Sequence, residues 1–362
     1  MTMPHLAEPL TLRGTTVRNR MWLAPMCQYS AEDGMPNDWH LVHLASFARG
    51  GFGLLVTEAT AVVPEGRITP HDVGLWDDEQ AVAWARVLDA VHAAGALAAV
   101  QLAHAGRKAS TYRPWAPGKG TIPVTDGGWP TLGPSPLPFD GYLAPREMTV
   151  AQIDHVVEAF ATATRRALAA GFDMVEVHAA HGYLLHQFLS PLSNQRTDGY
   201  GGSPENRARL LREVVSAVRA AWPAERPVLV RLSATDWVEG GLQVEDVAAA
   251  AASLVELGAD LIDVSSGGNV LAPIPLAPGY QVPFAREVRD VTGLPVSAVG
   301  LITSPAQAEQ VLADGDADAV MVARVALREP SWPLRAAHEL GMPVSVDGPV
   351  PWPAQYVRGA WA

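Results

Sequence analysis

The segment from Val175 to Gly202, VEVHAAHGYLLHQFLSPLSNQRTDGYGG, brings three chemically versatile side chains together after a short apolar run. His178 and His181 are three residues apart, and Tyr183 follows two residues later. An imidazole can bind a metal, donate a hydrogen bond or transfer a proton, and a phenol can donate a proton. Three interpretations are open for the histidines: metal ligands, structural side chains, or donors that hold the oxygen of a small molecule.

A metal site would need a third ligand, and the sequence offers a poor one. Glu176 is the nearest carboxylate, but side chains alternate along a strand, so we expect it to face away from His178. The chain has no HExxH, CxxC or Asp-rich cluster. Two N–H donors aimed at one carbonyl oxygen would stabilise the charge that develops on it. The residues alone favour this donor interpretation without removing the other two.

The composition is that of a globular protein. The chain has 362 residues, of which 48% are hydrophobic and 18% charged, and its formal net charge is −12. An acidic chain without a basic block is a poor partner for nucleic acid. Neither a signal peptide nor a run of 18 apolar residues is present, so we expect no membrane span and a cytoplasmic protein. The single cysteine, Cys27, excludes an intrachain disulfide, and taken alone it indicates a small buried hydrophobe.

Short apolar runs recur along the chain, and longer helical patterns such as EQAVAWARVLDAVHAAG and VEDVAAAAASLVELGAD lie between them. Continuously apolar runs are typical of strands buried on both faces. Three helix-to-strand joints are alike: AAGALAAV, AAGFDMVEV and ELGADLIDV. No GxGxxG follows the first run, which argues against an open dinucleotide-binding sheet. The eight predicted strands are 21–27, 53–61, 96–102, 173–178, 227–233, 260–266, 295–300 and 318–324.

Eight strand–helix units predict a single-domain α/β protein, a (β/α)₈ TIM barrel over residues 1–362. The stretch LTLRGTTVRNR before the first strand is expected to form a β-hairpin over the bottom of the barrel. Residues 107–146, rich in Pro, Gly and Trp, follow the third strand and should form an extended loop over the catalytic face. Residues 345–362 form a C-terminal tail.

In such barrels the chemistry lies at the carboxyl ends of the strands. Those ends carry few carboxylates and many hydrogen-bond donors, which suits an electron-rich or anionic ligand. The candidates there are Pro25, Met26, Cys27, Tyr29, Glu58, Ala59, Thr60, Gln101, His104, His178, His181, Tyr183, Arg231, Ser265, Ser266, Gly300, Ala323 and Arg324.

With these residues assembled, the sequence resembles the Old Yellow Enzyme family of FMN-dependent NAD(P)H ene-reductases, in particular the branch whose first strand ends in a cysteine. The resemblance extends over nearly the whole chain. It is carried by APMCQYS, QLAHAGRKA, HAAHGYLLHQFLSPLSNQRTDGYGGSPENR, VRLSATD and QYVRGAW.

The resemblance implies an FMN site. Gln101 would bond the pyrimidine side of the flavin, and Arg231 would lie near N1, where its fixed charge stabilises the reduced ring. The phosphate would be held near Gly300 and at Ala323–Arg324. The residues expected to border the ring are Pro25, Met26, Cys27 and Ala59.

The resemblance also implies how a substrate is handled. His178 and His181 would hold its activating oxygen and Tyr183 would supply the proton, while His186 would pack behind the site as a structural residue. Cys27 would tune the flavin or meet the substrate, and nothing in the sequence marks it as a nucleophile. Tyr29 would line the substrate cavity, although a half-buried packing aromatic is its alternative. No metal is expected, and the partners expected are activated alkenes and NADPH or NADH.

Two departures from the family pattern stand out. The eighth strand ends in Ala323-Arg324, where relatives have Gly-Arg, which adds a methyl group near the phosphate. The tail reads QYVRGAW, with Ala360 between Gly359 and Trp361. In the branch, the arginine that matches Arg358 enters the neighbouring subunit's site, which predicts a homodimer or dimer of dimers. A disordered tail is the alternative.

These inferences predict an enzyme that reduces the activated C=C bond of α,β-unsaturated carbonyl or nitro compounds by ping-pong hydride transfer. Two rivals are kept: a metal-dependent TIM-barrel hydrolase that uses His178 and His181, and a flavin-binding barrel without turnover. A demethylating or ring-opening relative is discounted because one cysteine cannot hold an iron–sulfur cluster.

Overall fold

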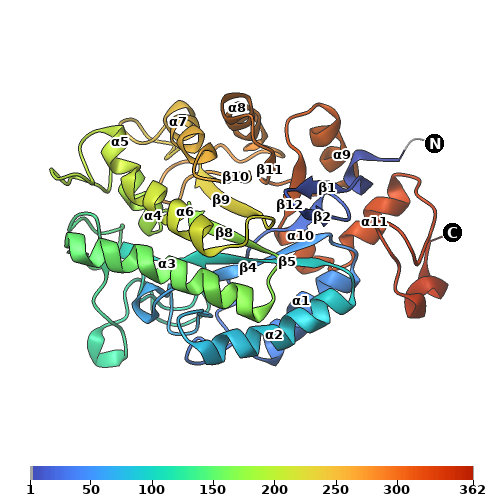
Figure 1. The fold of residues 1–362 in the computed structure, drawn as a ribbon, viewed down its shortest axis with the longest axis horizontal. Coiled ribbons are helices and arrows are strands. Elements are labelled where there is room, and N and C mark those ends of the chain that lie inside the picture. Colours follow the sequence, from blue (N-terminus) through green and yellow to red (C-terminus); the bar gives the residue numbers. More distant parts are fainter. Residues whose placement is uncertain (1–2, 362) are drawn as a thin grey trace.

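The computed structural model of the protein describes residues 3–361. Eight parallel strands close into a barrel in the order β10-β11-β12-β3-β4-β5-β8-β9 (Figure 1). The predicted (β/α)₈ barrel is therefore confirmed. Its strands are β3 (Met21–Leu23), β4 (Leu54–Ala61), β5 (Leu97–Ala103), β8 (Met174–Ala179), β9 (Val228–Ser233), β10 (Leu261–Ser265), β11 (Val296–Ala298) and β12 (Ala319–Val322).

Each predicted run overlaps one barrel strand, but some strands are shorter than predicted and two, β5 and β8, end one residue later. β3 ends at Leu23, four residues before the predicted end. Pro25 lies just beyond this end and has no N–H to continue the hydrogen-bond ladder. Residues 24–29 therefore leave the sheet and are free to line the mouth of the barrel.

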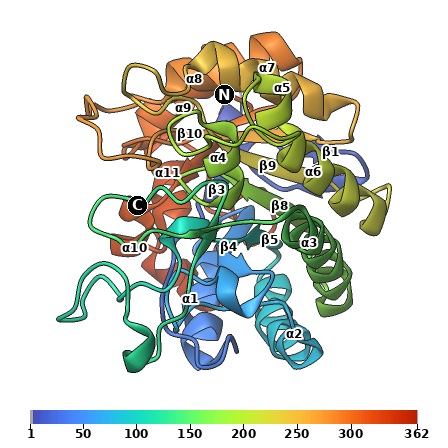
Figure 2. The same ribbon diagram turned by 90° about the vertical axis from the view of Figure 1, so that its left-hand side faces the viewer.

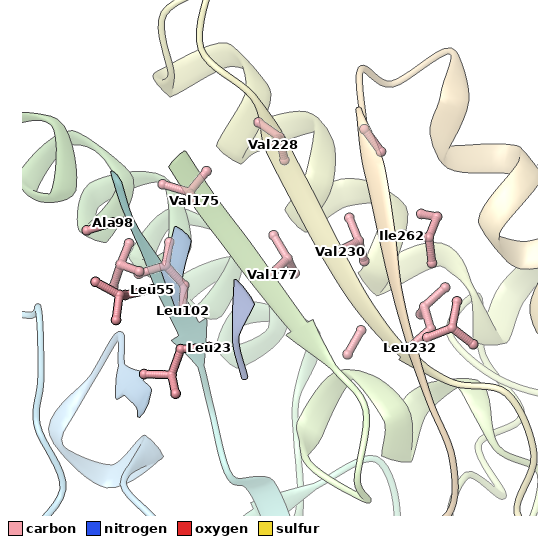
Figure 3. Close-up of a cluster of buried hydrophobic side chains, with 14 of the residues drawn as sticks. Leu23, Leu55, Ala98, Leu102, Val175, Val177, Val228, Val230, Leu232 and Ile262 are labelled. Carbon is pink, nitrogen blue, oxygen red and sulfur yellow. The ribbon is translucent and has the colours of Figure 1, made fainter. Parts of the chain in front are cut away.

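The strands are buried on both faces, as the apolar runs predict. On β8, Val175 and Val177 pack outward with Val230 of β9 in the main core, which Figure 3 shows. The alternate residue Met174 packs inward, in a second apolar cluster with Leu229. Since successive side chains face opposite ways, the two faces of one strand supply a structural core and a barrel interior.

The helices surround the barrel (Figures 1 and 2). α3 shows how the chain delivers a strand to the site. It begins after Thr149, whose hydroxyl accepts the Gln152 N–H, and ends at Gly171, whose φ of +97° favours glycine. β8 then starts within three residues. The helices are α1 (Asp38–Arg49), α2 (Asp78–Ala93), α3 (Val150–Ala170), α4 (Leu184–Leu189), α5 (Pro204–Arg207), α6 (Arg209–Ala221), α7 (Val244–Val255), α8 (Val282–Thr292), α9 (Pro305–Ala313), α10 (Arg324–Arg328) and α11 (Trp332–Glu339).

An antiparallel hairpin, β1 (Leu10–Leu12) and β2 (Thr15–Val17), precedes the barrel, as predicted. Leu12 and Val17 join the apolar cluster that contains inward residues of the barrel strands, such as Trp22 of β3. The hairpin thus closes the amino-terminal end of the barrel with apolar side chains.

The segment 107–146 follows β5 and lies at the left of Figure 1, whereas the C-terminal tail lies at the right. In Figure 2 the segment faces the viewer. Its regular structure is limited to two short strands, β6 (Leu132–Gly133) and β7 (Arg146–Glu147), and two 3₁₀ turns, Gly106–Lys108 and Val124–Asp126. Within residues 3–361 no helix is both long enough and apolar enough to cross a bilayer.

Candidate functional site

The turn after β8 brings His178, His181 and Tyr183 together. Its backbone is left-handed at His181 (φ +57°) and Gly182 (φ +71°), and a Cβ on Gly182 would collide with the Gly268 carbonyl. This turn sets the imidazole of His178 5.3 Å from that of His181 and 5.0 Å from the ring of Tyr183, between centroids. The His178 ring is nearly perpendicular to both neighbours, with interplanar angles of 80° to His181 and 78° to Tyr183.

His186 supports this turn from behind. It is fully buried, its Nδ1 accepts the Gly182 N–H at 2.9 Å, and its Nε2 lies 3.1 Å from Asp236 Oδ1. These contacts occupy both ring nitrogens, so the side chain has no free edge to offer a ligand.

The two site histidines are neutral imidazoles. The Ala180 N–H points at Nδ1 of His178 at 3.4 Å, which leaves the proton of this ring on Nε2. Nε2 of His181 lies 2.8 Å from Ser265 Oγ. Burial, followed by the positive charge of Arg231, lowers the pKa of both imidazoles well below its ordinary value. Neutral rings can donate one N–H each without introducing a buried charge.

The predicted orientation of Glu176 was wrong. Glu176 and His178 are two residues apart, so they share one face of β8, and both point into the barrel. Glu176 is completely buried there and its Oε1 accepts the Gln101 amide N–H at 2.7 Å. Yet no group of three or more His, Cys, Asp or Glu residues that could hold a metal exists within residues 3–361.

Arg231 lies in the same interior, on β9. Its Nε forms an ion pair with Asp263 Oδ2 at 3.0 Å. Its terminal nitrogens make no hydrogen bond to the described residues, and Arg231 lines a cavity of about 280 Å³. The guanidinium is thus anchored on one side and offers its other side to a ligand.

The same cavity reaches the ends of β11 and β12. Gly300 has φ +128°, a conformation that glycine alone adopts easily, and a Cβ there would press on Gln281. Ala323, which precedes Arg324, has φ −121° and ψ −89°, so its φ is not in the left-handed region that favours glycine. The cavity is lined by His181, Arg231, Ser265, Ser266, Tyr280, Gln281, Val299, Gly300, Leu301, Ile302, Thr303, Met321, Ala323, Arg324 and Val325.

This donor set fits FMN. One end of the cavity has a fixed guanidinium for an electron-rich ring, and the other has glycine backbone and Arg324 for a phosphate. Gln101 lies nearby with its amide oxygen unused, since its amide nitrogen donates to Glu176. A larger cavity of about 350 Å³ lies outside the barrel between α5, α6 and α7, and it contains none of the predicted site residues.

A second cluster borders the other side of the mouth. Cys27, Tyr29 and Tyr183 pack against a small apolar group that includes Ala59. Pro25 and Met26 lie in the segment that leads to Cys27. Burial, then the negative charges of Asp72 and Glu58, raises the pKa of the Cys27 thiol well above its ordinary value. The thiol is therefore protonated, in agreement with the view that it is no nucleophile.

The segment 107–146 reaches this cluster. Trp115 packs edge-on against Tyr29, with ring centroids 5.9 Å apart, and Trp129 packs against the group that contains Ala59. The indole of Trp129 is held by the Glu65 carbonyl at 2.8 Å.

Arg358 is not part of the site of its own chain. It is exposed on the six-residue 3₁₀ helix Ala354–Gly359. The tail around it is ordered by packing: Trp361 stacks on His338 at 5.2 Å and meets Trp352 at 5.6 Å.

The sequence reasoning overlooked Lys108, although it lies in the quoted motif QLAHAGRKA. Its ammonium donates to the carbonyls of His181 (2.8 Å) and Gly268 (2.9 Å) and lies 5.1 Å from the Tyr183 ring centroid. Burial, then the charge of Arg107, lowers the pKa of Lys108 to about 8. A lysine five residues past the end of β5, on the catalytic face, was the available signal.

Known proteins resemble this chain over its full length. The family model of the NADH:flavin oxidoreductase / NADH oxidase family matches residues 5–342. The NADPH dehydrogenase of Geobacillus thermodenitrificans is 47% identical over 98% of both chains.

Solved structures agree. Morphinone reductase in complex with tetrahydroNAD has a TM-score of 0.77 and 30% identity, over 94% of this chain and 92% of that one. The Old Yellow Enzyme homologue from Zymomonas mobilis also has a TM-score of 0.77, with 28% identity over 99% of this chain and 100% of that one. The chain therefore belongs to the Old Yellow Enzyme family of FMN-dependent NAD(P)H oxidoreductases.

Proposed function

We propose that this FMN-dependent NADPH dehydrogenase reduces the activated C=C bond of α,β-unsaturated carbonyl compounds and nitroalkenes. The observation that carries the proposal is the cluster of two neutral imidazoles and one neutral phenol beside the Arg231 cavity. Bound FMN supplies hydride transfer, from NAD(P)H and then to the β-carbon, and a shared binding place makes the two half-reactions alternate.

His178 and His181 orient the substrate through its activating oxygen. Negative charge grows on this oxygen as the β-carbon receives hydride, so two N–H donors bind the transition state more tightly than the ground state. Loss of one such donor typically costs ~10²–10³ in rate. Because the rings are neutral, they polarise the oxygen without protonating it.

Tyr183 donates the proton that completes the reaction at the α-carbon. Burial first, then the nearby Cys27 and Asp72, raises the pKa of Tyr183 well above its ordinary value, so the phenol stays protonated. The α-carbon of an enolate is a strong enough base to take a proton from a phenol. The ammonium of Lys108, 5.1 Å from the ring centroid, stabilises the phenolate until solvent returns the proton.

The remaining site residues are proposed to bind FMN or to shape the substrate cavity. Arg231 and Gln101 would face the flavin ring, and Gly300, Ala323 and Arg324 the phosphate. Pro25, Met26, Cys27 and Ala59 would border the ring, and Tyr29 the substrate. We also propose a homodimer in which Arg358 of each subunit completes its partner's site, since Arg358 is exposed and contacts no site residue of its own chain.

An anaerobic visible spectrum of the FMN-loaded protein tests the proposal. NADPH should bleach the flavin band, and 2-cyclohexenone should restore it. Bleaching without restoration by any activated alkene would contradict the proposed substrate class. A band that NADPH cannot bleach would indicate flavin binding without turnover, and a colourless protein with bound zinc would indicate the hydrolase.

A further inference from the structure

A ring of buried polar side chains lies inside the barrel beneath the site. Five neighbouring strands, from β5 to β11 around the barrel, each contribute one of its members. The register pairs Gln101 with Glu176, and Asp263 with both Arg231 and Ser297. Every member is at least 95% buried. Protein interiors tolerate such groups when hydrogen bonds and opposite charges compensate them, so each partner matters.

Three buried atoms of this ring have no hydrogen-bond partner among residues 3–361: Glu176 Oε2, Arg231 Nε and Asp263 Oδ2. The last two face each other as an ion pair, whereas Glu176 has only the Gln101 amide N–H, which its Oε1 accepts. Asp263 is better supplied, because its Oδ1 accepts the Ser297 hydroxyl at 2.9 Å and its Oδ2 faces Arg231 Nε at 3.0 Å.

The charges in this ring do not balance if both carboxyl groups are ionised. Glu176 is faced by Asp263 from β10, by Arg231 from β9 and by the uncharged Gln101 from β5, and the neutral His178 follows it on β8. One guanidinium cannot neutralise two buried carboxylates. Burial, then the charge of Asp263, raises the pKa of Glu176 to about 8, and burial also raises that of Asp263. The pair therefore keeps one proton at neutral pH.

We propose that Glu176 holds this proton and, through Arg231, sets how strongly the barrel favours reduced over oxidised FMN. The inference rests on the proposed placement of Arg231 beside the flavin. With Glu176 protonated, Arg231 is countered by Asp263 alone. Once Glu176 ionises, a second negative charge lies beneath the ring and opposes the negative charge that FMN gains on reduction. Glu176 is thus a positioning residue, which acts without touching FMN or substrate.

The midpoint potential of bound FMN, measured against pH from 6 to 10, tests the proposal. The curves of the wild type and of Glu176→Gln should coincide below about pH 8 and diverge above it, with the wild type at the lower potential. Glu256→Gln, at an exposed carboxylate that caps the C-terminus of α7, should follow the wild type throughout. Parallel curves for the wild type and Glu176→Gln over the whole range would overturn the proposal.

Infrared difference spectra of the flavin-free protein give a second readout. The wild type minus Glu176→Gln spectrum at pH 7 should contain the C=O band of a protonated carboxylic acid. In an Asp263→Asn background Arg231 needs a new counter-ion, so the same subtraction should show a carboxylate instead. A carboxylate in the wild-type subtraction would refute the assignment even if Glu176→Gln bound FMN poorly. Both readouts are independent of whether 2-cyclohexenone reoxidises the flavin, so the proposed substrate class can fail separately.

Discussion

Replacement of His178 tests whether the site works through neutral N–H donors. The His178→Ala variant removes the Nε2–H donor and leaves the Ala180 N–H without its acceptor. One lost donor to a developing oxyanion corresponds to about 3 kcal/mol, so kcat/KM for 2-cyclohexenone should fall by ~10²-fold or more. Loss of the acceptor for a buried backbone N–H adds a stability cost of roughly 1–3 kcal/mol.

His178→Asn is the matched control, because an amide keeps an N–H donor but cannot become an acid. It should recover most of the activity that the alanine variant loses, if the ring acts as a neutral donor. Stopped-flow spectroscopy should be used to measure flavin reduction and reoxidation separately, and urea unfolding should be used to measure the stability of each variant.

The pH dependence of activity tests whether the neutral or the protonated form of His178 is the active one. The lowered pKa of His178 means that the folded protein resists protonating it, so the ring stays neutral from pH 6 upward. The ratio of wild-type to His178→Ala activity should therefore be constant between pH 6 and 9. A ratio that collapses as pH rises through the ordinary imidazole range near 6.5 would show that the charged ring is the active form, and the donor account would be wrong.

Four other outcomes are expected. Tyr183→Phe should leave bleaching by NADPH unchanged and slow reoxidation by 2-cyclohexenone ~10²-fold or more in stopped-flow traces. Arg358→Ala should lose activity, and mixing its subunits with Tyr183→Phe subunits should restore some, because one site of the hybrid dimer is then complete; no gain on mixing would argue against a shared site. Ala323→Gly should change the Kd of FMN by less than about threefold in a fluorescence titration, because the negative φ of Ala323 does not require glycine. Trp22→Ala should lose roughly 3–5 kcal/mol in urea unfolding and the exposed Trp39→Ala about 0.5 or less, since only Trp22 fills the bottom of the barrel.

The fold could be predicted because the same sequence pattern recurs in every strand–helix unit. Each barrel strand is a short apolar run whose two faces are both buried, and the helix-to-strand joints repeat around the ring. An error of a few residues at one strand end, as at β3, leaves the closed topology unchanged. The hairpin was expected from its place before the first strand, and Leu12 and Val17 fix it against the bottom of the barrel.

The site was predicted less completely because its polar interior depends on partners from other strands. Asp263 sits in DLIDVSS, a run that reads as an ordinary strand, and only the register between β9 and β10 puts it beside Arg231. Glu176 was assigned to the wrong face through an error of strand parity, which the spacing itself could have corrected. The role of Lys108 could be inferred only once the position of the Tyr183 ring was known. Arg358 contacts no site residue of its own chain, so one chain alone does not show where it acts.

The inward face of β8 shows how the barrel separates stability from chemistry. Met174, Glu176 and His178 follow one another along this face at two-residue steps of roughly 7 Å. Met174 lies in the apolar cluster inside the barrel, Glu176 in the ring of buried polar side chains, and His178 in the site. Glu176 is therefore too deep to contact a substrate but close enough to act by its charge. A unit charge at ~7 Å and an effective dielectric constant of ~20 contributes about 2 kcal/mol. This energy is comparable to the contribution of one N–H donor to the activating oxygen of the substrate. A substitution at this level should change the energetics of the flavin while every contact to the substrate stays in place.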